Sequence, residues 1–172
     1  RQAISFARGA SYGSGGVHPR QFALLSDKLL WDIAGIFSAM FRMGFCSAAV
    51  VFILIRLIPK PLGGVRPIGL FTGLLRIFMR ALRLTIGEQW VSKHVPPAWY
   101  GVKGKSSEQA VWSRLAAVRY AKETRNVALG ELYDITKAFD HLQLAVVKKW
   151  AAHFDFPLIL LRFLFSVYQA PR

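Results

Sequence analysis

The sequence predicts an α+β fold that is rich in helix, and three observations support this. Apolar residues recur every three or four positions between Phe22 and Met40, which is the spacing of an amphipathic helix. The β-branched and aromatic stretch VVFILIRLIPK, followed by the turn LGG and by VRPIGL, predicts a β-hairpin. Thr72 and Ser106 stand where helix N-caps are expected, ahead of further apolar periodicity.

Length and composition indicate a folded protein with a polyanionic partner. The 172 residues, 53% of them hydrophobic, are enough to bury a core and correspond to one domain or a large piece of one. Lys and Arg number 23 against nine Asp and Glu, which gives a formal net charge of +14. Such a charge favours nucleic acid or an anionic membrane as the partner.

The positive charge is concentrated in one interval. No carboxylate occurs between Asp32 and Glu88, and this interval contains seven cations: Arg42, Arg56, Lys60, Arg66, Arg76, Arg80 and Arg83. Phosphates that replace their counterions with such cations bind favourably. A solvated basic face without a ligand explains the same charges equally well.

The remaining elements follow in order along the chain. Residues 1–16 are rich in Gly, Ser and Arg and predict a flexible lead-in. Gly44 is expected to end the first helix, and Ser106 with Gln109 resembles a capping box that opens a helix running to about Thr124. The stretch VALGELYDI predicts a short strand, and helices are expected from His141 and from Pro157.

Two apolar runs raise the alternative of a small basic membrane-associated protein. Residues 43–55 form a run of 13 residues between arginines, short of the roughly 20 that a spanning helix needs. The run at residues 157–168 is interrupted by Arg162, so no stable membrane insertion is expected. Cys46, the single cysteine, lies among apolar neighbours and is expected to be a small buried hydrophobe.

The stretch DITKAFD, residues 134–140, is the most informative for chemistry. Polymerases that use two metal ions need a carboxylate at the end of a rigid strand to hold those ions. Asp134 ends the predicted strand and suits that role. Taken alone, an ordinary strand-end aspartate is the simpler explanation.

DITKAFD resembles the first palm motif of reverse transcriptases, in which an aromatic residue follows an aspartate by five positions. The resemblance implies that Asp134 is catalytic and binds Mg²⁺, two ions in the complete domain, assisted by the backbone carbonyl of Ile135. It further implies that Phe139 is a steric gate that selects deoxynucleotides. A core aromatic is the competing explanation for Phe139. Asp140 is better explained as the N-cap of the next helix than as a third metal ligand.

LIPKPLGGVRPIGL is similar to the fingers hairpin of the same family. The resemblance implies that Lys60 and Arg66 bind the incoming nucleotide. A lysine point charge suits the outer phosphates, and a planar guanidinium can cover the base and contact the α-phosphate. A generic basic surface hairpin is the alternative.

WYGVKGKSSEQAVW resembles a segment that non-LTR retrotransposon reverse transcriptases place close to the template. The resemblance implies that Lys103 and Lys105 meet template phosphates, while Gly101 and Gly104 let the strand approach the backbone. A flexible basic loop before a capped helix explains the same residues.

Together the motifs imply a partial right-hand polymerase: residues 17–125 as a fingers-like region and residues 126–172 as the start of a palm, with one palm strand. SVYQAPR resembles the stretch before the second palm motif, so the fragment is expected to be inactive alone. The implied partners are an RNA template, a DNA primer and deoxynucleoside triphosphates, in an intracellular, nuclear or ribonucleoprotein setting. The alternative function is a non-catalytic remnant that binds RNA through its basic surface.

Overall fold

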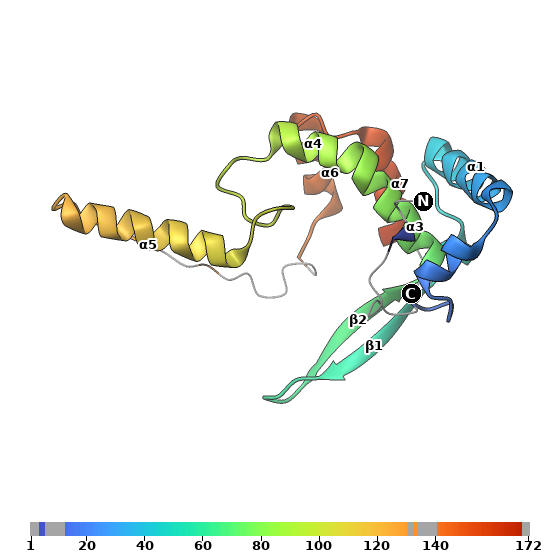
Figure 1. Cartoon of the computed structure of the whole chain (residues 1–172), viewed down its shortest axis with the longest axis horizontal. Helices are drawn as coiled ribbons and strands as arrows, with labels where there is room; N and C mark the ends of the chain where they lie inside the picture. The colour runs from blue at the N-terminus through green and yellow to red at the C-terminus, as the bar shows by residue number, and fades with distance from the viewer. Residues whose placement is uncertain (1–3, 6–12, 131–132, 134–140, 170–172) are drawn as a thin grey trace. The chain divides into compact units, whose positions relative to one another are not determined.

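The computed structural model describes residues 4–5, 13–130, 133 and 141–169 (Figure 1). Packing divides the chain into a larger unit, Arg1–Gln89 with Leu144–Arg172, and a smaller unit, Trp90–Gln143. The described residues are mainly helical, with a two-stranded antiparallel sheet, so the predicted α+β class is confirmed. The predicted fingers-like and palm regions do not coincide with these packing units and stay predictions about function.

The larger unit begins with a 3-10 helix and a long α-helix. The 3-10 helix η2, Pro19–Leu24, starts at a capping box between His18 and Gln21. Helix α1, Asp27–Met43, starts only after Ser26, whose hydroxyl accepts the Leu29 N–H. The helix predicted to run on from Phe22 is therefore broken into two, because two successive caps each begin a new helix. Gly44 ends α1 with φ 62°, as predicted.

The predicted hairpin is confirmed. After the short helix α2, Ala48–Val51, strand β1, Ile53–Pro59, pairs antiparallel with β2, Val65–Phe71. The register runs from Ile53 opposite Phe71 to Pro59 opposite Val65. The hairpin extends away from the helices of the larger unit (Figure 1).

Thr72 joins the hairpin to helix α3, Gly73–Leu82. Its hydroxyl oxygen accepts the Leu75 N–H at 3.2 Å, which confirms the predicted N-cap, and it donates to the Val50 carbonyl at 2.6 Å. The helical path continues through a π-helical turn, η3, Arg83–Gly87, into α4, Glu88–His94. One hydroxyl thus ties the start of α3 to the residues that precede β1.

Replacing Thr72 with valine is expected to destabilise the larger unit by about 1–2 kcal/mol, because the isosteric side chain loses the cap and the bond to Val50 together. Urea unfolding followed by circular dichroism measures this change. Thr72→Ser keeps the hydroxyl and is expected to stay within about 0.5 kcal/mol of the unsubstituted chain. Equal losses in both variants would contradict the role given to the hydroxyl.

The core of the larger unit forms where α1, α3 and α7 meet. Helix α7, Leu158–Tyr168, follows α6, Leu144–His153, and places Phe163 at the centre with no exposed surface. The Phe78 ring stacks on Phe37 with centroids 4.4 Å apart and meets Phe163 edge-on at 4.9 Å. Such aromatic contacts add to the free energy gained by burial alone. Cys46 is buried in the same core, as predicted.

Both apolar runs that suggested a membrane are accounted for within this unit. The first is divided among the end of α1, the cap at Gly44, α2 and the start of β1, and the second is the core helix α7. Within the described part of the chain, no helix has the length and apolar content needed to cross a bilayer.

Parts of the expected lead-in pack against the larger unit. Ile4 is buried in the core, and the Ser14 hydroxyl donates to the Phe52 carbonyl at 3.0 Å. Gly13 has φ 80°, and a Cβ there would stand 2.2 Å from the Phe71 carbonyl oxygen. Gly13 and Ser14 therefore lie against the base of the hairpin. Position 13 requires glycine, because a side chain would clash with the Phe71 carbonyl.

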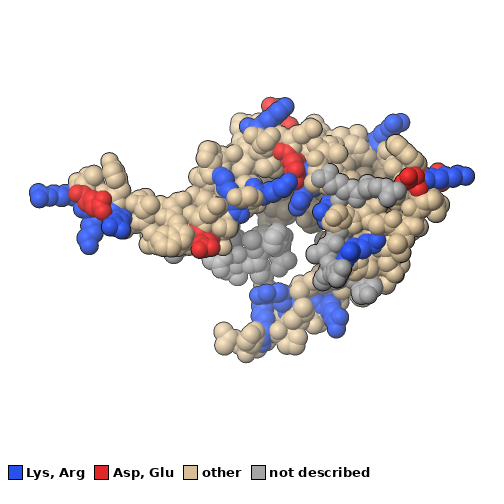
Figure 2. All heavy atoms as spheres, viewed as in Figure 1, with Lys and Arg blue, Asp and Glu red and all other residues tan. Residues whose placement is uncertain are grey.

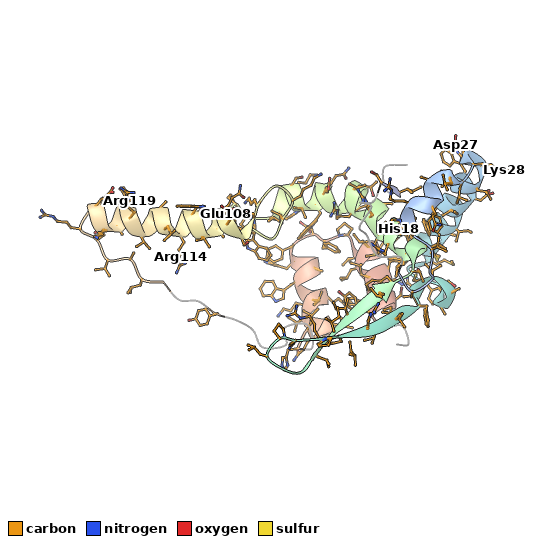
Figure 3. All side chains as sticks on the ribbon, turned by 60° about the horizontal axis from the view of Figure 1, so that its bottom comes forward. His18, Asp27, Lys28, Glu108, Arg114 and Arg119 are labelled. Atoms are coloured by element: carbon orange, nitrogen blue, oxygen red, sulfur yellow. The ribbon has the colours of Figure 1, made fainter. Side chains whose placement is uncertain are left out.

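The smaller unit is built around helix α5, Ser107–Glu123. Ser106 and Gln109 form the predicted capping box, and the helix ends one residue before Thr124, so the sequence placed it correctly. Arg114 packs against Gly130, on the opposite side of α5 from Arg119 (Figure 3). The cations of α5 are therefore spread around the helix.

The predicted palm strand does not form in the part of it that the structure describes. Residues 127–130 and residue 133 are irregular, and Leu129 and Tyr133 are 93% and 85% exposed. A strand needs a partner for its backbone N–H and C=O groups, and β1 and β2 are the only paired strands among the described residues. Helix α6 begins at Leu144, later than the start predicted at His141, and so does not begin next to Asp140.

Candidate functional site

The candidate site is one face of the hairpin β1–β2. Residues directly opposite each other in an antiparallel pair lie on the same face, and successive residues alternate between faces. Arg56 pairs with Ile68 and Arg66 pairs with Ile58, so both arginines share one face. Lys60 follows Ile58 by two residues, so the same alternation places Lys60 on this face too. We call the face that carries Arg56, Lys60 and Arg66 the basic face.

The turn holds Lys60 close to Arg66. The Lys60 N–H donates to the Gly64 carbonyl at 3.0 Å, and the Gly63 N–H donates to the Lys60 carbonyl at 3.1 Å. Gly63 and Gly64 have φ of 89° and 80°, which other residues adopt only with strain. The glycines that the sequence placed in this turn therefore fold the chain back so that Lys60 and Arg66 lie near the same tip.

The opposite face of the hairpin is apolar. Ile53, Ile55, Leu57 and Pro59 of β1 lie on it with Val65, Pro67, Gly69 and Phe71 of β2. At the hairpin base this face opens into a cavity of about 280 Å³, whose lining is apolar apart from Arg76 and Tyr168. The cations of the hairpin therefore project to one side only, where they alternate with Leu54, Ile58, Ile68 and Leu70.

All three cations of the basic face are exposed to solvent. Lys and Arg side chains are seen gathered on the hairpin in Figure 2. Because the sequence holds no carboxylate between Asp32 and Glu88, no neighbour in the hairpin itself neutralises them. A phosphate ligand at the hairpin tip would therefore meet positive charge that no carboxylate of the hairpin offsets.

Arg56 is a functional candidate that the sequence analysis did not assign. The sequence showed it only as one cation of the carboxylate-free interval, whereas the register puts it beside Arg66 on the basic face. The sequence already indicated that Arg56 and Lys60 share a face, because residues 56, 58 and 60 alternate by two along one predicted strand. Four residues of strand separate Arg56 from Lys60, about 13 Å, so the basic face extends beyond its tip.

The arginines of α3 and η3 contribute less to this site. Arg83 lies 3.8 Å from the Glu88 carboxylate in an ion pair. Arg76 and Arg80 are half-buried, and Arg76 lines the apolar cavity. Leu75, Phe78 and Leu82 of α3 are buried in the core, and Ile86 of η3 packs against it.

The predicted template loop belongs to the smaller unit. The Lys105 ammonium donates to the Pro97 carbonyl and lies 5.5 Å from the centre of the Tyr100 ring, so this lysine holds the loop in shape. Lys103 is exposed. Gly101 and Gly104 have open space where a Cβ would stand, and Gly104 has φ 84°. The loop therefore leaves its glycine backbone accessible, as approach of a strand would require.

The remaining predicted site residues, Asp134, Ile135 and Phe139, lie outside the described residues. Their proximity to Lys60 and Arg66 stays a prediction. Among the residues that the structure does describe, no three His, Cys, Asp or Glu side chains gather as metal ligands.

The chain was compared with protein-family models, with curated proteins and with solved structures, and none of the three comparisons found a match.

Proposed function

We propose that the chain is the fingers and first palm motif of an RNA-directed DNA polymerase, in which the basic face of the hairpin grips the incoming deoxynucleoside triphosphate. The observation that supports this most is the pairing of β1 with β2, closed by the Lys60–Gly64 hydrogen bond, which sets Lys60 and Arg66 near the tip of an exposed hairpin. A triphosphate carries several negative charges, and a lysine beside an arginine is the pairing that phosphoryl-transfer sites use.

Each residue has a distinct task in this proposal. Lys60 binds the outer phosphates as a point charge, and Arg66 contacts the α-phosphate and covers the base. The two glycines of the turn shape the tip that folds over the nucleotide. Asp134 would hold Mg²⁺, which would neutralise charge as the primer hydroxyl bonds to the α-phosphate and pyrophosphate leaves. Phe139 excludes a 2′-hydroxyl.

The double variant Lys60→Gln with Arg66→Gln is expected to weaken binding of a deoxynucleoside triphosphate by about 100-fold. Each lost charge-assisted hydrogen bond contributes about 1.5–3 kcal/mol, and 1.4 kcal/mol is a tenfold change in affinity. Isothermal titration of the full chain measures it. The matched control is Arg20→Gln with Lys149→Gln, two exposed cations outside the hairpin, for which a change below about threefold is expected.

The same preparations separate the polymerase from the alternative of a non-catalytic RNA-binding remnant. Arg56 favours that alternative, because it extends the basic face beyond the two cations that a nucleotide needs. If the unsubstituted chain binds single-stranded RNA with a steep salt dependence but has no measurable affinity for the triphosphate, the remnant is the better description. Equal weakening of triphosphate binding in both double variants would contradict a specific site at the hairpin tip.

A further inference from the structure

A second groove lies on helix α7, away from the hairpin. Its volume is about 480 Å³, and its lining comes from α7, from Lys148 of α6 and from Gly44 at the end of α1. These elements all belong to the larger unit. The α7 residues that line it are Leu158, Leu161, Arg162, Phe165 and Ser166, with Gln169 just beyond the helix.

This groove is separate from the cavity at the hairpin base. The base cavity uses Leu164, Val167 and Tyr168 of the same helix. At 100° per residue, most groove positions point to a different side of α7 from those three, and Leu161, about 20° from Tyr168, lies at the border between them. The groove and the base cavity therefore share no lining residue.

The groove has two cations and no carboxylate among its lining residues. Arg162 is held by its packing, because a Cβ at position 44 would stand 2.6 Å from the Arg162 Cδ. The aliphatic part of the Arg162 side chain therefore packs directly against Gly44, the residue that ends α1. Among the described residues, no carboxylate lies within ion-pair distance of Arg162 or Lys148. An anion placed between them would find positive charge that no described neighbour neutralises.

The other lining groups define what else the ligand must carry. The Ser166 hydroxyl accepts the Cys46 N–H at 3.1 Å and donates to the Phe163 carbonyl at 2.7 Å, so its donor is already used. The side chains left to bind the polar part of a ligand are Lys148, Arg162 and the Gln169 amide. Leu158, Leu161 and Phe165 form an apolar wall beside them. The ligand that fits this combination has an anionic group attached to a flat apolar part.

We propose that this groove binds a nucleotide, with its phosphate between Lys148 and Arg162 and its base against Phe165 and the leucines. The nucleotide is either free or one unit of a single strand, since both present the same phosphate and base. A nucleoside without phosphate is expected to bind poorly, because it carries no anionic group for Lys148 and Arg162 to bind. This site does not depend on the function proposed for the hairpin.

The test uses the full chain carrying Lys60→Gln and Arg66→Gln, so that the hairpin tip no longer contributes. A fluorescent derivative of adenosine monophosphate is titrated into it, with adenosine, unlabelled adenosine monophosphate and a ten-nucleotide single-stranded RNA as competitors. Arg162→Gln and Lys148→Gln are each expected to weaken binding about tenfold, the effect of one charge-assisted hydrogen bond. Lys149→Gln, the adjacent exposed lysine outside the groove, is expected to change it less than twofold.

The outcomes distinguish the sources of the ligand and can overturn the site. Displacement by RNA at concentrations well below those of free nucleotide identifies a strand as the ligand, and displacement by the free nucleotide alone identifies the small molecule. The site is refuted if no saturable binding occurs, if adenosine competes as well as its monophosphate, or if Lys149→Gln matches Lys148→Gln. Lys148 is exposed, so Lys148→Gln still tests the site if circular dichroism shows that Arg162→Gln changes the helix content.

Discussion

Replacing Phe163 with alanine is expected to destabilise the larger unit by about 3–5 kcal/mol, because the change leaves a ring-sized cavity at the centre of the core. Phe163 has no exposed surface, and its ring packs edge-to-face with Phe78 and, tilted, against Phe41. A loss of this size is a large share of the stability of a typical domain. It would remove the packing that supports both the hairpin base and the groove on α7.

Urea unfolding followed by circular dichroism measures the loss at Phe163. Ile159→Ala is the matched control, since Ile159 lies on the same helix but is 42% exposed. Alanine has the higher helix propensity, so this control is expected to cost less than about 1 kcal/mol. Similar losses in the two variants would contradict the central role given to Phe163 in the aromatic cluster.

Replacing Asp134 with asparagine is expected to abolish nearly all primer extension, by on the order of 1,000-fold, when the chain is joined to a downstream region that supplies an aspartate pair. The reason is the several kcal/mol of charge stabilisation that metal-binding carboxylates give to phosphoryl transfer, at 1.36 kcal/mol per tenfold in rate. Extension of a DNA primer on an RNA template, with deoxynucleotides, measures this effect.

Asp155→Asn is the control for that experiment. Asp155 has φ 50° at the turn between α6 and α7, a conformation that asparagine also adopts readily, so the substitution removes a carboxylate without straining the backbone. Undiminished extension by the Asp134 variant would eliminate the role proposed for this residue. Salt-sensitive RNA binding with no extension by the unsubstituted chain would favour the non-catalytic remnant.

Local chemistry made several elements predictable from the sequence. Thr72 and Ser106 each start a helix where expected, and Gly44 ends one. Capping is predictable because it depends on one side chain or one φ angle and on the few residues around it. The start of α1 was missed, since the apolar period continues through the break at Ser26. The strand expected near Tyr133 could not be judged locally, because strand formation needs a partner elsewhere in the chain.

The candidate site was predictable in part for the same reason. Lys60 and Arg66 were identified from a motif, and their shared face then followed from the register. Parity along one strand already grouped Arg56 with Lys60, and the register was needed to place both with Arg66. The contact of Lys105 with Pro97 and Tyr100 depends on how the loop folds back on itself, which composition does not reveal.

The burial of Cys46 has a practical consequence for studying the hairpin tip. Burial raises the pKa of the Cys46 thiol, and the thiolate is the form that reacts with maleimides. The native sulfur is therefore shielded from such reagents twice, by its low thiolate content and by the core around it. Leu62 is fully exposed in the turn, so a fluorophore attached through Leu62→Cys would label that loop selectively and test the closure proposed for it.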